Sequence, residues 1–173
     1  MSQEESPELE GLKTVANLMA LAARTAPKAK GVDNIVIKML DDSQRRKLVE
    51  TMRRIGKEEN IAFFLRDAEN VEGAAAVVVL GTRLQKLGLP HCGFCGFKDC
   101  QSNTTGVCAF NVGDLGIACG SAAAVAARHH VDTRTMFSIG RCAVELGLLG
   151  PEVRVAYGFP LSATGKNPFF DRH

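Results

Sequence analysis

The order of apolar segments in this sequence predicts an α+β fold, in which helices pack on a mixed sheet. Some segments place apolar residues every three or four positions, as amphipathic helices do, and others are short apolar runs typical of buried strands. The chain has 173 residues, 46% of them hydrophobic, which is enough for one compact core. Because no repeat or linker interrupts the pattern, we expect residues 1–173 to form a single domain.

The first half of the sequence predicts three helices and two strands. The first helix has a strong start signal, because Ser6 can cap it and Pro7 suits the first helical position. The expected elements are a helix from Ser6 to Arg24, a strand over Ile35–Leu40, a helix capped by Asp41-Asp42-Ser43, a short helix over Asn60–Ala68 and a buried strand over Ala74–Leu80.

The second half predicts a long loop, then helices and strands in alternation. The residues from about Leu89 to Asn111 are rich in cysteine, glycine and polar side chains, which favours a loop over residues 89–111. The elements expected after it are a helix over Leu115–His129 capped by Asp114, a strand over Thr133–Ile139, a short helix over Arg141–Leu146 and a strand over Val153–Phe159.

Four of the six cysteines lie within 17 residues of this loop, with the spacing Cys92-x2-Cys95-x4-Cys100-x7-Cys108. Thiolates are the usual ligands of iron–sulfur clusters and also bind zinc, and four of them complete either site. In a chain without an export signal, clustered cysteines favour metal ligation over disulfides. We therefore expect one metal site in the loop, and we rank a [4Fe–4S] cluster ahead of Zn2+.

Zinc is the main alternative, in a structural or binding protein that the four-cysteine loop stabilises. Zinc sites with four cysteines often use two CxxC turns, whereas this loop has one, at Cys92 and Cys95. Gly93 and Gly96 favour a cluster, because they allow tight bends and leave N–H groups free to point at sulfur. Buried cysteines of the core, or two disulfides in an exported protein, are the remaining interpretation.

Charge and composition argue against nucleic acid and membranes as partners. The formal net charge is +2, and nine Phe, one Tyr and no Trp leave little for base stacking. The first ten residues are acidic and polar, unlike the basic and then apolar start of a signal peptide. Apolar runs such as Ala74–Leu80 are too short to span a bilayer. We expect a cytoplasmic protein.

The helix expected over Leu115–His129 is rich in small residues. Gly113, Gly116 and Gly120, with the alanines that follow, give it one nearly flat face. Such a face suits tight packing on the sheet, contact with a planar cofactor or contact with a twofold partner. The two cysteines outside the loop, Cys119 and Cys142, are expected in the core.

The sequence resembles a prokaryotic family of unsettled activity that is described as containing a ferredoxin domain. The resemblance lies in CGFCGFKDC, in VCAFNVGDLGIACGSAAAVAARHHVDTRTMFSIG and in YGFPLSATGKNPFFDR. It covers most of the chain and is most specific at PLSATGKNPFFDR. It implies a ferredoxin-type cluster held by Cys92, Cys95, Cys100 and Cys108.

Three stretches are also similar to the flavin-dependent nitroreductase family. RTAPKAKGVDNIVIKML resembles that family's Ala-Pro-Ser loop and first strand, VGDLGIACGSAAAVAARHHVDTRTMFSIG its central helix and next strand, and VRVAYGFPLS its last core strand. This resemblance implies a nitroreductase-like mixed sheet flanked by helices, with the cysteine loop as an insertion. It also implies an intertwined homodimer with FMN at the interface.

The candidate flavin contacts lie in irregular segments. Lys28, Lys30, Lys166 and Arg172 could meet around a phosphate, and Asn34 loosely matches the Asn or Gln that contacts flavin in the nitroreductase family. That family's N-terminal Arg-rich phosphate motif has no equivalent here. We therefore expect FMN to bind weakly or not at all.

Together these patterns favour a homodimeric iron–sulfur redox protein that passes single electrons to a flavin, an organic substrate or a partner protein. The alternatives are a zinc-stabilised structural or binding protein and an FMN-dependent reductase whose cysteine loop is incidental. No acid, base or nucleophile stands at a diagnostic spacing, so the sequence assigns no catalytic residue and no substrate.

Overall fold

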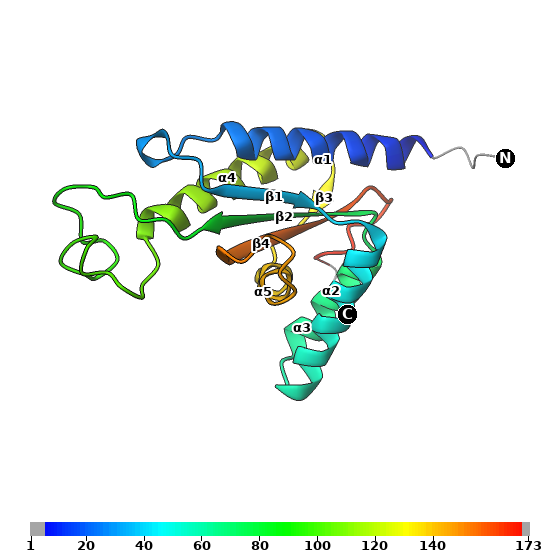
Figure 1. Cartoon of the computed structure of the whole chain (residues 1–173). Coiled ribbons are helices and arrows are strands. Elements are labelled where there is room, and N and C mark those ends of the chain that lie inside the picture. Colours follow the sequence, from blue (N-terminus) through cyan, green and yellow to red (C-terminus); the bar gives the residue numbers. More distant parts are fainter. Residues whose placement is uncertain (1–5, 171–173) are drawn as a thin grey trace.

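The computed structural model describes residues 6–170 as a sheet between two layers of helices (Figure 1). The elements in chain order are α1 (Pro7–Thr25), the 3-10 turn η1 (Ala29–Gly31), β1 (Ile35–Met39), α2 (Asp42–Glu58), α3 (Ala62–Glu72), β2 (Ala76–Arg83), α4 (Ala109–Arg128), β3 (Asp132–Thr133), α5 (Phe137–Glu145) and β4 (Val153–Ser162). The predicted α+β class, with helices flanking a sheet, is confirmed.

The strands lie in the order β1-β2-β4-β3, and each neighbouring pair of these strands is antiparallel, where we had expected a mixed sheet. The connection between β1 and β2 explains the direction of the first pair. α2 and α3 pack against each other as a helical pair, which leaves and rejoins the sheet at the same end. β2 therefore runs back along β1.

Each face of the sheet has its own helices and its own core cluster. α1 and α4 pack together on one face, where Met19 and Leu115 are fully buried. α2, α3 and α5 cover the other face, around Met52 and Ile139. The inner strand β2 contributes to both clusters, because the side chains of successive residues point to opposite faces.

Two glycines let α5 lie very close to β4. A Cβ on Gly140 would stand 1.8 Å from the carbonyl oxygen of Ala156, and a Cβ on Gly158 would stand 2.0 Å from Cγ2 of Ile139. The predicted strand over Thr133–Ile139 is accordingly wrong for most of its length. β3 has two residues, and a helix begins at Phe137, because this face must present glycine and small side chains to β4.

α4 begins at Ala109, well before the predicted start at Leu115, and its N-cap residue is Cys108. Asp114 is therefore inside the helix and caps nothing; both of its carboxylate oxygens accept a hydrogen bond from the Ala29 N–H, at 3.1 and 3.2 Å. Within residues 6–170, α4 is the one helix long and apolar enough to cross a membrane by length and composition. Its packing on α1 and β2 accounts for the apolar residues on its buried side.

Candidate functional site

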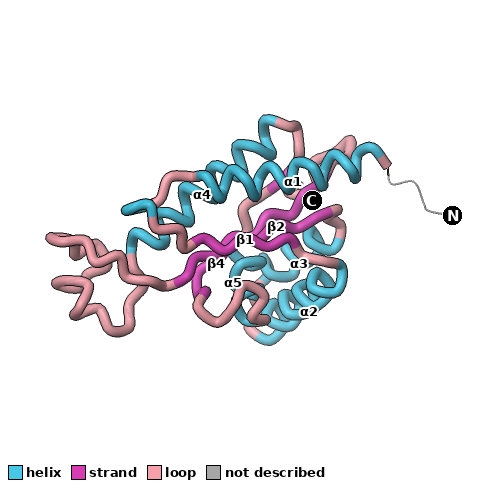
Figure 2. Tube along the Cα trace, turned by 45° about the horizontal axis from the view of Figure 1, so that its top comes forward, coloured by secondary structure: helices cyan, strands magenta, loops and turns pink. Residues whose placement is uncertain are grey.

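The four clustered cysteines lie in the connection between β2 and α4, which contains no helix or strand over residues 84–108. The last three residues of the predicted loop, 109–111, form the first turn of α4. Figures 1 and 2 both show this connection projecting beyond one end of the sheet, away from the two helical layers. The loop is thus an appendage to the core and contributes little to it.

All four loop thiols are free and half-buried, whereas Cys119 and Cys142 are free and buried. Within residues 6–170, no three side chains among His, Cys, Asp and Glu converge closely enough to hold a metal ion. The loop therefore brings the predicted ligands into one segment without bringing their sulfur atoms together. Metal binding would have to draw them in, which is common because metal sites are seldom preformed.

Two glycines shape the CxxC turn. Gly93 has φ 139° and Gly96 has φ 84°, a region that other residues rarely adopt. The Gly96 N–H donates to the Gly93 carbonyl at 2.9 Å and closes the turn around Cys95. The bend that we predicted at these glycines is present.

Asn103 donates a hydrogen bond to a loop sulfur. Its side chain is 1% exposed, and its Nδ2 lies 3.4 Å from Sγ of Cys95. Its Oδ1 accepts a hydrogen bond from the Gly106 N–H at 2.7 Å. No sequence signal selects Asn103, because an asparagine in a polar loop usually marks only a turn.

The loop is fastened to the body at its root. The Lys30 Nζ donates to the Leu87 carbonyl at 2.9 Å, and the Gln85 N–H donates to Oδ1 of Asn111 at 3.2 Å. At the tip, the rings of Phe94 and Phe110 stack with centroids 5.6 Å apart, which ties the CxxC turn to the first turn of α4. The loop is therefore restrained at both ends although it lacks regular structure.

The fourth cysteine has a distinct electrostatic position. Cys108 is the N-cap of α4, a 20-residue helix, and no side chain caps that end. The unpaired N–H groups of a helix N-terminus carry partial positive charge and favour a negatively charged sulfur nearby. This position suits a thiolate ligand.

The two other cysteines are unsuited to metal binding. Burial raises the pKa of the Cys119 thiol to about 12. Burial, followed by the nearby Glu145 carboxylate, raises the pKa of the Cys142 thiol to about 12 as well. Both therefore remain protonated at neutral pH, as expected for core residues.

The predicted flavin contacts between α1 and β1 are engaged within the chain. The Lys28 ammonium group donates to the carbonyls of Ala23, Arg24 and Ala26, at 3.3, 2.6 and 2.8 Å, and so caps the end of α1. Lys30 holds the root of the cysteine loop, as described above. In this structure neither cation faces a phosphate site.

Lys166 lies far from that segment. The Asn34 carbonyl accepts from Arg83, at one end of β2, whereas β4 ends beside Ala76, at the other end. An eight-residue strand is roughly 23 Å long at 3.3 Å per residue. The Asn167 side chain donates a hydrogen bond to Asp132 of β3, which keeps the segment after β4 at the end of the sheet where β4 ends. One chain therefore does not bring these lysines together, and the remaining candidate, Arg172, lies outside the described residues.

Two buried amide groups lack partners. Within residues 6–170, Nδ2 of Asn34 and Nδ2 of Asn111 donate to no acceptor within hydrogen-bonding distance, although the residues are only 4% and 0% exposed. Both stand where β2 gives way to the loop, because the chain around Arg83 and Gln85 bonds to each of them. Unsatisfied donors of this kind are expected to meet water or a ligand.

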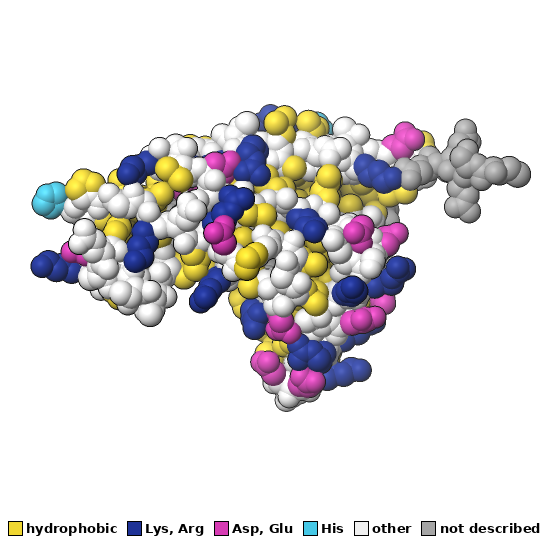
Figure 3. Space-filling model, in the orientation of Figure 1, with side chains coloured by type: hydrophobic (Ala, Val, Ile, Leu, Met, Phe, Trp, Pro, Cys, Tyr) yellow, Lys and Arg dark blue, Asp and Glu magenta, His cyan; other side chains and the backbone are white. Residues whose placement is uncertain are grey.

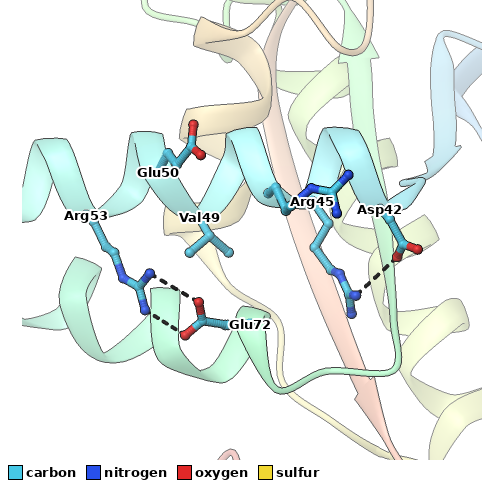
Figure 4. A pocket seen from close by; sticks show the side chains of 7 residues that line it. Asp42, Arg45, Val49, Glu50, Arg53 and Glu72 are labelled. Atoms are coloured by element: carbon cyan, nitrogen blue, oxygen red, sulfur yellow. Dashed lines mark hydrogen bonds and ion pairs between the residues drawn. The ribbon is translucent and has the colours of Figure 1, made fainter.

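Charged residues elsewhere are paired or scattered. Figure 4 shows a surface cavity of about 360 Å³ along α2, in which Arg53 binds both carboxylate oxygens of Glu72 and Arg45 binds Asp42. Its full lining is Asp42, Arg45, Arg46, Val49, Glu50, Arg53 and Glu72, three cations and three carboxylates. On the face shown in Figure 3, charges of both signs are interspersed. Neither feature indicates a site for a polyanion.

The glycines of α4 face outward. A Cβ on Gly113, Gly116 or Gly120 would meet no other atom within 4 Å. Ile117, on the same helix, is 47% exposed. Of the interpretations given to this flat face, tight packing on the sheet is therefore wrong, because the sheet contacts the opposite side of the helix.

Comparison with known proteins identifies the family. A family model described as "Uncharacterized protein containing a ferredoxin domain (DUF2148)" matches residues 104–172. An uncharacterized protein of Archaeoglobus fulgidus is 40% identical over 173 residues, an alignment covering 94% of this chain and 92% of the relative. The chain belongs to this ferredoxin-domain family. Of the four loop cysteines, the matched range contains Cys108 alone.

Solved structures similar to this ferredoxin-domain protein include FMN-dependent oxidoreductases and nitroreductases. The FMN-dependent nitroreductase NfnB from Mycobacterium smegmatis gives a TM-score of 0.61 at 14% identity, over 94% of this chain and 80% of that chain. Iodotyrosine deiodinase bound to FMN and 3-iodo-L-tyrosine gives a TM-score of 0.61 at 13% identity, over 99% of this chain and 87% of that chain. Nitroreductase A from Vibrio parahaemolyticus gives 0.57 at 16% identity, over 96% of this chain and 63% of that chain, less than two thirds of its length. The predicted nitroreductase-like fold is confirmed.

Proposed function

We propose that this protein is a cytoplasmic iron–sulfur redox protein, in which Cys92, Cys95, Cys100 and Cys108 hold a [4Fe–4S] cluster. The observation that carries the proposal is the set of four free, half-buried thiols in one projecting loop of an oxidoreductase-like fold. The ferredoxin-domain family and this fold together indicate a redox protein. The loop is the part of the chain whose side chains suit a one-electron centre.

A bound cluster would supply a one-electron carrier whose potential depends on charge, hydrogen bonds to sulfur and solvent access. The chain would contribute the rest. Gly93 and Gly96 give the backbone its bend, the N-terminus of α4 favours negative sulfur at Cys108, and the loop places the ligands outside the helical layers. A partner protein could approach a cluster held in this position without any rearrangement of the sheet.

Analysis of anaerobically purified protein tests the proposal. We expect about four iron and four sulfide per chain, a brown colour and a paramagnetic signal after one-electron reduction. A colourless protein with one zinc per chain would instead support the structural or binding protein considered above. A yellow protein with flavin and no iron would support an FMN-dependent reductase.

The FMN-dependent reductase is the second candidate, and two observations favour it. The fold is shared with enzymes that bind FMN, and the unpartnered amides of Asn34 and Asn111 could donate to a flavin ring. A phosphate dianion, however, needs convergent cations or N–H donors when it leaves water. Lys28 and Lys30 are bonded to carbonyls, and Lys166 lies at the other end of the sheet.

We therefore predict that titration of the isolated protein with FMN gives no binding in the submicromolar range. Fluorescence quenching of free FMN is a sufficient measurement. Submicromolar binding that is weakened by about 1–3 kcal/mol in both Lys166→Ala and Arg172→Ala, the loss expected for a charge-assisted hydrogen bond, would contradict this prediction. In that event the flavoenzyme becomes the leading function.

We also propose a homodimer formed through the outward face of α4. This face combines an exposed Ile117 with glycines that allow another backbone to approach closely. We predict that light scattering of the wild-type protein gives twice the chain mass of 18.6 kDa. Ile117→Glu should return the mass to that of one chain, because a carboxylate would be buried at the contact.

The control for the dimer is Phe63→Glu, which adds the same charge on α3, in the other helical layer, at a ring that is 41% exposed. We expect this variant to keep the wild-type mass. A wild-type mass of one chain at micromolar concentration, or equal masses for Ile117→Glu and the wild type, would exclude this interface.

A further inference from the structure

Asn103 is an unusual residue for its position. Within residues 84–108, only Leu87 and Asn103 are buried, and Asn103 is the polar one, at 1% exposed. Burying a carboxamide costs free energy unless its groups find partners. The contacts that it makes should therefore explain why the loop folds around it.

Its orientation is fixed by the backbone. Oδ1 accepts a hydrogen bond from the Gly106 N–H at 2.7 Å, and an N–H can bond only to the oxygen end of the carboxamide. The nitrogen end must then face the other way, where Nδ2 lies 3.4 Å from Sγ of Cys95. The sulfur therefore faces a donor, and no flip of the amide would preserve both contacts.

An aromatic ring holds this arrangement in place. A Cβ on Gly106 would lie 2.6 Å from Cε2 of Phe97 and 3.0 Å from Oδ1 of Asn103. A methyl group at residue 106 would therefore have to displace the ring or the amide. Phe97, Gly106 and Asn103 thus form one packed unit, which aims a single N–H group at Cys95.

We infer that Asn103 is a positioning residue that raises the reduction potential of the loop's metal centre by donating to the Cys95 sulfur. The inference rests on the proposed iron–sulfur function and assigns a residue that the family description does not. An N–H donor withdraws charge from a thiolate ligand and so stabilises the reduced, more negative cluster. The same contact orients the Cys95 side chain, and loss of such an orienting contact weakens metal retention about tenfold or more.

Two substitutions at Asn103 distinguish the effect of its N–H donor from an effect on the fold of the loop. Asn103→Asp keeps an oxygen for the Gly106 N–H but places a carboxylate against the sulfur, whereas Asn103→Leu removes both contacts at similar volume. We expect the midpoint potential, measured by anaerobic redox titration, to be lower than wild type in both variants and lowest in Asn103→Asp. Iron should pass to a chelator about tenfold faster in both, as the loss of a hydrogen bond to a charged group implies.

Gln101→Leu is the matched control, because Gln101 is an exposed side chain in the same loop. It should keep the wild-type potential and the wild-type rate of iron loss. If both Asn103 variants retain a full cluster with an unchanged potential, the inference is wrong. An equal shift in Gln101→Leu would also overturn it, because the effect would then belong to the loop in general.

If neither Asn103 variant retains a cluster although circular dichroism shows an intact fold, Gly106→Ala provides the test instead. It leaves the amide in the chain and displaces only its anchor, so we expect a smaller shift to lower potential and faster iron loss. Wild-type behaviour in Gly106→Ala would contradict the inference. Failure of the proposed function is distinguishable, because wild-type protein would then contain no iron and sulfide at all.

Discussion

Replacing any one of the four loop cysteines by alanine is expected to abolish metal retention. Each thiolate supplies one of four ligands, and a site with three is open to water and chelators. The two remaining cysteines, Cys119 and Cys142, are buried in the core and cannot supply a replacement thiolate. Iron, sulfide and zinc per chain, measured after anaerobic desalting of Cys92→Ala, Cys95→Ala, Cys100→Ala and Cys108→Ala, test this.

Cys119→Ala and Cys142→Ala are the controls and should retain the wild-type metal content. Both thiols are buried in the core and remain protonated at neutral pH. Full metal content in Cys108→Ala would contradict the four-ligand assignment and point to His91, the residue directly before Cys92, as the fourth ligand. Cys119 is excluded from that role, because it lies three helical turns further along α4, roughly 16 Å at 1.5 Å per residue.

Gly140→Ala is expected to destabilise the fold more than alanine at any other glycine. The added Cβ would stand 1.8 Å from the Ala156 carbonyl oxygen and 2.7 Å from the Tyr157 nitrogen, so backbone rather than a side chain must move. Overpacking of this kind costs about 3 kcal/mol or more, a large share of the stability of a typical domain. Urea unfolding of the two proteins measures the difference directly.

Gly11→Ala is the matched control, because Gly11 lies on the exposed side of α1 and a Cβ there would meet nothing within 4 Å. Alanine is the better helix former, so we expect this variant to gain about 0.5–1 kcal/mol. Opposite signs for the two substitutions are the expected result. Equal midpoints in urea for Gly140→Ala and the wild type would show that α5 does not lie against β4 as described.

The parts of the fold that were predictable from the sequence carry local signals. α1 begins after Ser6 with Pro7 at its first position, and the Asp41 carboxylate caps α2 together with Gln44, as the capping residues indicated. β2 contains a run of three valines, Val77 to Val79, which is typical of a buried strand. Such signals act over a few residues and therefore depend less on tertiary context than the other elements do.

The misplaced elements depend on distant contacts. Residues 133–139 are rich in β-branched and aromatic side chains, which favour a strand, but the Ser138 hydroxyl reaches Oδ2 of Asp67 at 2.6 Å and Gly140 lies against β4. Both partners are remote in sequence, so the helical outcome could not be derived locally. The candidate site shows the same division: the cysteine spacing was visible, whereas the amide of Asn103 became significant only when the fold brought it to Cys95.

The position of the loop between β2 and α4 also determines when the loop cysteines emerge from the ribosome relative to the strands. β2 is an inner strand whose two neighbours are β1, made before the loop, and β4, made after the loop and α4. During synthesis β2 therefore waits with one edge unpaired while the cysteine loop has already emerged. The four thiols become available to metal before the sheet is complete, and metal delivery to the nascent chain can precede the final folding step.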